Sequence, residues 1–394
     1  MQTNLTDLKN SKMALVLSGG VVKAASWHLG VTLALEELGF SFASHGTNDP
    51  NQVKGSLEIG TFVGSSAGNL INLYITNGFT SQDVIDSFLK VQNSKIKPIS
   101  YKEMLYLKSI KLNPKREGIY DPFSEFPPVI KQILKPILSF SGFFSTEGVG
   151  EYINNNILKY KNFEDYKADL FIIATQLDHS RKVIFSKYNY PKPTHDSTAV
   201  YYTGIPVAEA ACASMSVPPF YTPFPVTNPH TSQIDYYIDG EIRETLSTHV
   251  AEDNGCEYII SSWTHTPYHY HDEVGSLANY GLHAICLQAI YLMIQKKIVA
   301  SRSRRLVAKD ILNTVNDYMK THKFSNTHRK DILNILERKL NFNPRIKHID
   351  IFPTHHDYQL FFANSFSLNP KHAAHAMKMG YKRTMEVFKD LDFK

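Results

Sequence analysis

The segment that most constrains the fold is TFVGSSAGNLINLY, residues 61–74. An apolar strand reaches Gly64 and a helix follows almost at once, so the chain must turn sharply between them. A serine in the middle of Gly-x-Ser-x-Gly at such a turn is typical of a nucleophile elbow, which holds the serine on a strained backbone. Gly64 and Gly68 remove Cβ atoms where strand and helix would collide. The pattern predicts Ser66 as a nucleophile, although small residues at such a turn can also serve packing alone.

The first part of the chain alternates strands and helices. Residues 13–17 read as a short apolar strand, 18–25 (SGGVVKAA) as a glycine-bearing loop, and 26–38 as a helix by the spacing of its leucines. A second strand at 57–63 precedes the helix that begins after Ser66. This order predicts an α/β fold with a mostly parallel sheet and helices on both faces.

The later segments continue the pattern with a larger helical share. We expect further strands at 169–176, 182–187, 235–241, 256–263 and 348–354, and helices at 206–217, over most of 276–340 and at 370–390. No convincing linker separates these segments. We therefore expect 1–394 to form a single domain, with a lid or membrane-facing insertion at 95–145 and a helical C-terminal part at 276–394.

Composition favours an ordinary globular protein. The chain has 394 residues, of which 43% are hydrophobic and 20% are charged. The isolated cysteines Cys212, Cys256 and Cys286 fit buried thiols in a reducing compartment better than a disulfide framework. No apolar run reaches the roughly 18 residues that span a bilayer, and the N-terminus does not resemble a secretory signal. We expect a cytoplasmic protein, either free or peripheral at a membrane.

A nucleophilic serine needs a group that accepts its proton. Histidines are plentiful downstream and would allow a Ser-His-Asp triad, but no sequence context singles one of them out. The segment YYIDGEIRE offers a carboxylate instead, because a strand ends at Ile238 and Asp239-Gly240 forms a turn. The carboxyl ends of parallel strands meet at one sheet edge, which would place Asp239 beside Ser66. Asp239 could then act as the base if burial raises its pKa, whereas an ordinary Asp-Gly turn is the alternative.

The loop SGGVVKAA lacks both the dinucleotide-binding fingerprint and the ending of a P-loop. Beside Ser66, the backbone N–H groups of Gly19, Gly20 and Val21 could stabilise the oxyanion of a tetrahedral intermediate. Lys23 would add positive charge nearby. The alternative is a tight turn with a solvated lysine.

In this order the motifs resemble those of the patatin-like phospholipase family. The matching segments are LSGGVVKAASWHLG, VGSSAGNL, AACASMSVPPFYTPF and IDGEIRETLSTHV, within core motifs at 13–263, and the final MKMGYKRTMEVF resembles a family C-terminus. The resemblance implies a three-layer α/β/α sandwich and a Ser-Asp dyad without a catalytic histidine, metal or organic cofactor. It also implies a lipid acyl hydrolase of the phospholipase A or lysophospholipase kind, acting on fatty-acyl esters of phospholipids or other lipids.

Carried over by position, the resemblance makes Ser66 the nucleophile and Asp239, followed by Gly240, the base. The oxyanion hole would comprise Gly19, Gly20, Val21 and Lys23.

Two positions depart from the family pattern. Val21 stands where the family usually has a third glycine, and a β-branched residue with positive φ would be strained there. Glu241 adds a second carboxylate after the Asp-Gly pair. These departures keep open a weakened or inactive lipid-binding relative, and an acyl-enzyme also allows an acyltransferase.

Three other features have less specific readings. The basic and aromatic stretch 95–116 could dock on an anionic membrane, consistent with a net charge of +5, or be a solvated insertion. The histidines of SWTHTPYHYHDE suggest a metal site, but Pro267 breaks the helix that would align them, so we expect no metal. The basic run 296–309 is expected to be the solvated face of an amphipathic helix, with lipid or partner contact as the alternative. We see no nucleic-acid-binding module, and the oligomeric state is left open.

Overall fold

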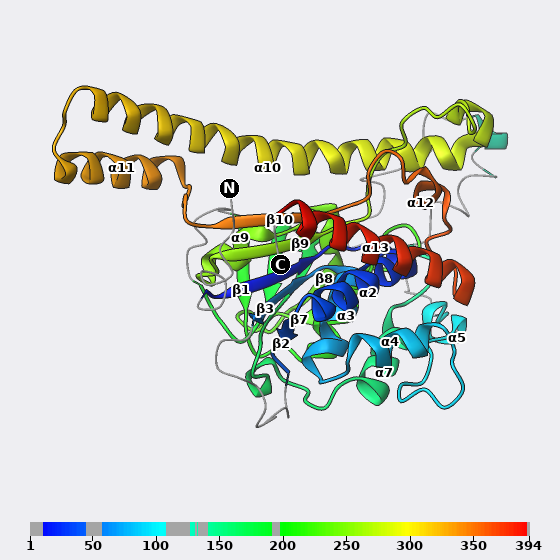
Figure 1. Cartoon of the computed structure of the whole chain (residues 1–394). Coiled ribbons are helices and arrows are strands. Elements are labelled where there is room, and N and C mark those ends of the chain that lie inside the picture. The colour runs from blue at the N-terminus through cyan, green and yellow to red at the C-terminus, as the bar shows by residue number, and fades with distance from the viewer. Residues whose placement is uncertain are drawn as a thin grey trace.

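The computed structural model describes residues 11–44, 57–107, 127–130, 132, 141–190 and 198–391. Its centre is a ten-stranded sheet with the main order β10-β9-β1-β3-β4-β5-β6, with β2 beside β3 and β8 linking β4 to β7. Figure 1 shows this sheet with helices packed around it. The strands are β1 (Met13–Leu17), β2 (Phe40–Phe42), β3 (Leu57–Gly64), β4 (Asp169–Gln176), β5 (Arg181–Phe185), β6 (Ala199–Tyr202), β7 (Phe224–Thr227), β8 (Ile234–Asp239), β9 (Tyr258–Ser262) and β10 (Lys347–Ile351).

The sheet is mostly parallel, as the sequence predicted. Strand β1 pairs in parallel with β3 and β9, and β3 pairs in parallel with β2 and β4. The exceptions are β5 and β8, which both run antiparallel to β4, and β7, which runs antiparallel to β8. The short strands β2, β6 and β7 were not predicted, because three or four residues give too little alternation to recognise.

Helices cover both faces of the sheet, which makes the α/β sandwich. Leu15 and Leu17 of β1 belong to a core cluster shared with helices α2, α3, α8 and α13, whereas Ala14 and Val16 face a second cluster that includes α9. The described helices are α2 (Val21–Glu37), α3 (Ser66–Thr76), α4 (Ser81–Phe88), α5 (Tyr101–Met104), α7 (Glu147–Asn156), η1 (Phe163–Asp165), α8 (Val207–Met215), η2 (Gly240–Ile242), α9 (Thr248–Asp253), η3 (Leu277–Tyr280), α10 (Gly281–Thr321), α11 (Asn326–Leu340), α12 (Tyr358–Phe362) and α13 (Pro370–Asp390).

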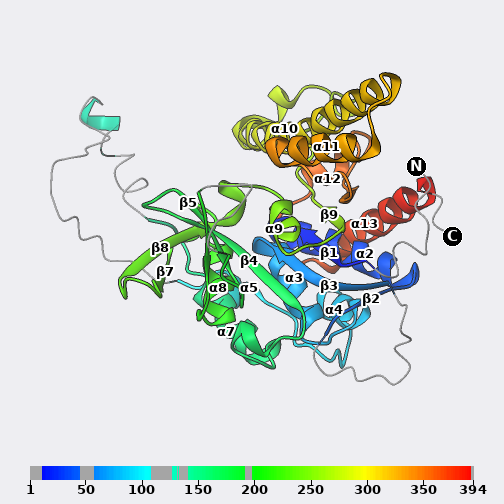
Figure 2. The ribbon, with the colours of Figure 1, turned by 90° about the vertical axis from the view of Figure 1, so that its left-hand side faces the viewer.

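Helices α2 and α13 lie side by side in both views (Figures 1 and 2). Glycine permits this close approach at two points. A Cβ on Gly30 would lie 1.9 Å from the carbonyl oxygen of Met377, and a Cβ on Gly380 would lie 2.2 Å from that of Trp27. The C-terminal helix is therefore an integral part of the layer that carries α2.

The predicted helix over 276–340 is two helices. Helix α10 passes above β9 and β10, and α11 runs back beside it (Figure 1). In the described residues one stretch, Leu277–Thr321, is long and apolar enough to cross a membrane, with a mean hydropathy of 1.4 in its most apolar window. No stretch long and apolar enough to span a membrane was predicted from the sequence. A single helix of this kind is weak evidence for a membrane span.

Two other predicted segments need comment. Helix α2 begins at Val21, so the glycine loop is limited to residues 18–20 and does not reach residue 25. Most of the predicted insertion at 95–145 lies outside the described residues. Its described part includes α5 and a β-bridge between Tyr106 and Ser145.

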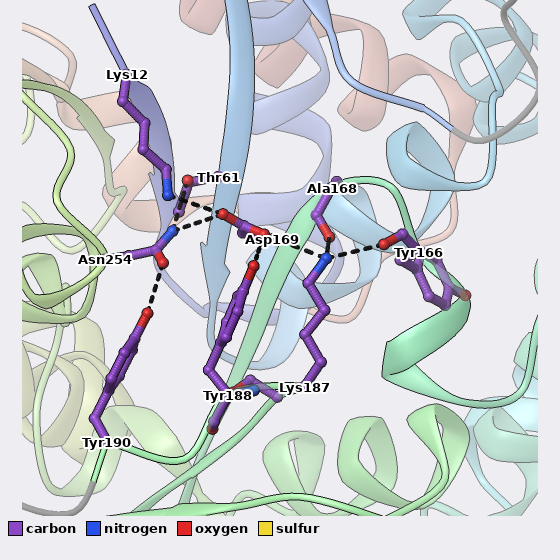
Figure 3. A network of polar contacts seen from close by, with 10 residues as sticks. Lys12, Thr61, Tyr166, Ala168, Asp169, Lys187, Tyr188, Tyr190 and Asn254 are labelled. Carbon is purple, nitrogen blue, oxygen red and sulfur yellow. Dashed lines mark hydrogen bonds and ion pairs between the residues drawn. The ribbon is translucent and has the colours of Figure 1, made fainter.

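A cluster of polar contacts stabilises the start of β4, and Figure 3 shows Asp169 at its centre. The carboxylate of Asp169 accepts hydrogen bonds from Tyr188 (2.6 Å) and Asn254 (3.0 Å) and pairs with Lys12 (3.0 Å) and Lys187 (3.3 Å). These partners lower the pKa of Asp169 to about 2 despite the opposing effect of burial. The cluster joins β1, β4 and the end of α9 at the sheet edge opposite to Ser66.

Candidate active site

Ser66 lies at the tip of a turn between β3 and α3, as the Gly-x-Ser-x-Gly motif indicated. Its φ is 50°, a left-handed conformation that non-glycine residues rarely adopt. A Cβ on Gly68 would lie 2.3 Å from the carbonyl oxygen of Leu17, and a Cβ on Gly64 would lie 2.7 Å from the backbone of Asn69. The two glycines therefore allow α3 to start directly against β1. Between them, Ser66 adopts the strained left-handed conformation.

Ser214 holds the backbone of Ser66 in place. The backbone N–H of Ser66 donates to Ser214 Oγ at 2.9 Å, and this hydroxyl donates to the carbonyl oxygen of Ile173 at 2.6 Å. All three residues are buried. The elbow is thus tied to both α8 and β4. Sequence reasoning missed Ser214, although it lies in the segment AACASMSVPPFY that carried part of the family resemblance.

Asp239 lies beside Ser66, but not for the predicted reason. Strand β8 is antiparallel to β4, so its carboxyl end does not point the same way as that of β3. Instead, Asp239 pairs with Ala174 of β4, two residues beyond Ile172, which pairs with Gly64. A Cβ on Gly240 would lie 2.4 Å from the carbonyl oxygen of Ile173, so glycine is needed for the turn to pack here.

The side chain of Asp239 is buried and hydrogen-bonded. Its Oδ1 accepts from the backbone N–H of Glu241 at 2.9 Å, and the Ser66 hydroxyl lies near enough to affect the pKa of the carboxyl group. Burial raises the pKa of Asp239 to about 6, although the Glu241 N–H and the Ser66 hydroxyl oppose the rise. Near pH 7 this group is therefore mostly ionised, yet it is more basic than an exposed aspartate.

The glycine loop lies against the same turn. A Cβ on Gly19 would lie 2.9 Å from Ser66 Cβ, so backbone and serine are in close contact. Gly20 has a φ of 126° and Val21 a φ of 59°, so the valine occupies the positive-φ position that the sequence analysis described as strained. Among the described residues, the N–H groups of Gly20 and Val21 donate no hydrogen bond, whereas that of Gly19 does.

The acceptor at Gly19 is the carboxyl group of Glu241. The N–H of Gly19 donates to Glu241 Oε1 at 2.8 Å. A Cβ on Gly19 would lie only 2.7 Å from Glu241 Cγ, so the two residues are in close contact. Glu241 Oε2 is buried and has no hydrogen-bond partner among the described residues. Burial and the neighbouring charge of Asp239 raise the pKa of Glu241 to about 8. The Glu241 carboxyl group thus accepts a hydrogen bond from one of the N–H groups expected to bind an oxyanion. The position of Glu241 in the sequence did not predict this contact.

Lys23 lies elsewhere, contrary to the prediction that it belongs to the oxyanion hole. Its ammonium group donates to Tyr291 Oη at 2.9 Å and to the carbonyl oxygen of Leu360 at 3.1 Å. Because α2 begins at Val21, Lys23 is on the first helical turn and its side chain extends towards α10 and α12. It anchors the C-terminal helices to α2, and it does not line the cavity beside Ser66.

A narrow apolar cavity of about 60 Å³ adjoins Ser66. Its wall combines α2, α3, α4, α7, the end of α8 and the segment after it, and α5 with the residues before it. Apart from Ser66 and Thr146, the lining side chains are apolar or aromatic: Val21, Val22, Ala25, Ala67, Leu70, Phe88, Ile99, Met104, Val149, Met215, Val217 and Tyr221. A serine hydroxyl at the wall of such a cavity can meet an ester whose acyl chain enters the apolar part.

Two histidines of the described structure, His28 and His265, are buried. His28 is buried between Ser262 Oγ and the carbonyl oxygen of Ser18, and burial lowers its pKa to about 4. His265 packs edge-on against Tyr291, and burial lowers its pKa to about 3. Within the described part of the chain, no group of three or more His, Cys, Asp or Glu side chains could hold a metal ion.

A comparison with known protein families identifies the family of this chain. The family model described as "Patatin-like phospholipase" matches residues 15–252. Among solved structures, the chain is similar to VipD from Legionella pneumophila, with 13% identity and a TM-score of 0.36 over 96% of this chain and 67% of that one. A search of curated proteins finds no significant match. Because the family model covers more than half of the sequence, the chain belongs to the patatin-like phospholipase family.

Proposed function

We propose that this protein hydrolyses fatty-acyl esters of phospholipids or lysophospholipids with Ser66 and Asp239 as a dyad. The observation that carries the proposal is the position of the Ser66 side chain beside the buried carboxylate of Asp239, at the wall of an apolar cavity. Membership of the family supports the broader class, a lipid acyl hydrolase. The phospholipase A or lysophospholipase type is the finer part of the proposal.

In the first step Ser66 Oγ attacks the ester carbonyl carbon while Asp239 accepts the hydroxyl proton. The tetrahedral intermediate collapses, the ester C–O bond breaks, and the alcohol leaves with a proton from Asp239. In the second step Asp239 takes a proton from water, whose oxygen attacks the acyl carbon of the acyl-serine. The bond between the acyl carbon and Ser66 Oγ then breaks, Ser66 Oγ takes the proton back from Asp239, and the fatty acid leaves. The raised pKa of Asp239 supports both transfers, because it lies near the working pH. Transfer to another alcohol would follow the same route.

The developing oxyanion needs hydrogen-bond donors from the glycine loop. The N–H groups of Gly20 and Val21 are without acceptors in the described structure, and that of Gly19 must first lose Glu241. We propose that the Glu241 side chain swings away when substrate binds. If the Glu241 side chain stays in place, the protein is instead a weakened or inactive lipid-binding relative. The hydrogen bond from the Gly19 N–H to Glu241 favours this alternative.

We further propose that the chain acts as one patatin-like domain, with its helical part from residue 276 onwards. Lipid substrates follow from the family, and a peripheral protein that meets a membrane from the cytoplasm is the proposal for its location. Of the predicted membrane contact at 95–116, residues 108–116 lie outside the described residues.

The test is lipid profiling of the fatty acids released from mixed phospholipid and lysophospholipid vesicles. The wild-type protein is compared with Ser66→Ala and Asp239→Asn. We expect release by the wild type, none by Ser66→Ala, and a loss of about a hundredfold or more for Asp239→Asn. Equal release by all three proteins, or dependence on a downstream histidine, would exclude the dyad. Lipid binding without release would support the inactive alternative.

A further inference from the structure

A second cavity, of about 440 Å³, lies between α10 and the core, away from Ser66. Helix α10 forms one wall, and the other wall comes from the segment after η2 and from β10. Its lining shares no residue with the apolar cavity at Ser66. It lies within the size range of small-molecule sites in proteins. The cavity therefore needs an explanation of its own.

Positive charge dominates this cavity. The described lining includes five basic side chains and two carboxylates; the basic ones are Arg243, Lys297, Arg302, Arg304 and Arg305.

The two carboxylates offset only part of this charge. Glu244 already pairs with the fully buried Lys182. Asp350 pairs with Arg302 at 3.2 Å. More cations than carboxylates thus face one open cavity, where their mutual repulsion favours the binding of an anion.

Arg304 and Arg305 are neighbours on α10, and the charges of Asp350 and Glu252 act on Arg305. Within the described part of the chain, Arg304 makes no hydrogen bond or ion pair. Arg305 is half-buried, and its Nη1 donates to Ser301 Oγ at 3.2 Å. Both residues also line an adjoining cavity of about 370 Å³, so the two spaces meet at this pair. The two adjacent guanidinium groups thus line both cavities.

We propose that this cavity binds a polyphosphate anion, either a soluble molecule or a lipid headgroup with two or more phosphates. Guanidinium groups match phosphate oxygens with paired donors, and several of them converge here. Thr245, Thr248 and Ser301 add hydroxyl groups to the lining. A lone carboxylate ligand would neutralise too little of this charge.

The structure disfavours recognition of an aromatic base in this cavity. Trp263 lines it but is only 4% exposed, and its ring stacks on Phe352 with centroids 4.4 Å apart. The Arg302 and Arg383 guanidinium groups also lie near the Phe352 ring, 5.5 and 5.9 Å from its centroid. No open aromatic face therefore remains among these residues, and the phosphates themselves must supply the affinity.

The test is calorimetric titration of the full chain with sodium tripolyphosphate in about 150 mM NaCl, where weak surface attraction is screened. The double variant Arg304→Gln/Arg305→Gln removes two cavity cations. The control Lys296→Gln/Lys309→Gln removes the same charge from exposed positions of α10 outside both cavities. Arg243→Gln changes the opposite wall and serves as a second variant should the first one misfold.

We expect saturable binding that the arginine variants weaken by about tenfold or more and the lysine control changes by less than about twofold. Equal weakening by both double variants, or no saturable binding, would overturn the proposal. Fluorescence adds a local readout, because of the two tryptophans only Trp263 lines the cavity.

The source of the phosphates is decided with vesicles. Phosphatidylcholine vesicles with phosphatidylinositol bisphosphate are compared with vesicles that carry equal charge as phosphatidylserine. Preference for the former that is lost in Arg304→Gln/Arg305→Gln assigns a lipid headgroup. Binding of tripolyphosphate without such a preference assigns a soluble ligand. Binding to both kinds of vesicle alike, unchanged in the arginine variant and without tripolyphosphate binding, contradicts the site.

Discussion

Replacing Glu241 by glutamine should flatten the dependence of stability on pH. The Glu241 carboxyl group is buried against Gly19, and its Oε2 lacks a hydrogen-bond partner among the described residues. Glutamine keeps the shape of the side chain and the acceptor for the Gly19 N–H, but it cannot ionise. The variant therefore isolates the effect of charge from the effect of filling the space.

The magnitude follows from the raised pKa. Burial and Asp239 raise the pKa of Glu241 from 4.5 to about 8. Between these values the folded protein keeps a proton that the unfolded chain releases. The stabilisation is complete below about pH 4.5 and is lost as the pH rises through about 8, at roughly 1 kcal/mol per pH unit. The total is of the order of 3 to 5 kcal/mol.

The assay is urea unfolding of wild type and Glu241→Gln between about pH 5 and pH 8. The wild type should lose stability relative to the variant across this interval, so that the two free energies of unfolding diverge steadily. Asp239 contributes a change of the same sign to both proteins, because its pKa is also raised, and this cancels in the comparison. Parallel curves would refute the assignment of a buried, protonated Glu241.

Other variants test the candidate active site and the packing of the helices that support it. Glu241→Ala should free the amide that its carboxyl group occupies, and should speed the reaction of Ser66 with a fluorophosphonate; a slower reaction would contradict the blocking role. Ser214→Ala should leave the buried N–H of Ser66 without a partner, lowering the free energy of unfolding by about 1 to 3 kcal/mol together with the labelling rate. Gly30→Ala should lower the melting temperature because of the clash with α13, whereas Gly60→Ala, which meets nothing within 4 Å, should not; equal effects would rule out this explanation.

The sequence predicted the parts of the fold that depend on local pattern. The turn at Ser66 follows from glycine spacing between a strand and a helix, and helix α13 follows from its periodicity. The position of Asp239 was correct, although the argument from parallel strands was wrong. A six-residue strand does not reveal its direction, since this depends on pairing with β4 in the folded sheet.

The contacts within the site depend on side-chain direction, which a motif does not specify. Lys23 was expected beside the oxyanion, but the early start of α2 turns it towards Tyr291. Glu241 was recognised as a departure, yet only the fold shows it on the Gly19 amide. The basic run 296–309 was expected to be solvated, and most of its basic side chains are indeed exposed, but the cavity beside it depends on the arrangement of α10 over the core.

Fluorophosphonate labelling followed by mass spectrometry of the modified peptide tests the central claim most directly. We predict an adduct on Ser66 in the wild type, none in Ser66→Ala, and much slower labelling in Asp239→Asn. In the wild type, the labelling rate should fall as the pH drops through about 6, because Asp239 then takes up a proton. An adduct on another residue, or labelling of Asp239→Asn at the wild-type rate, would contradict the assignment of Ser66 and Asp239 as the catalytic pair.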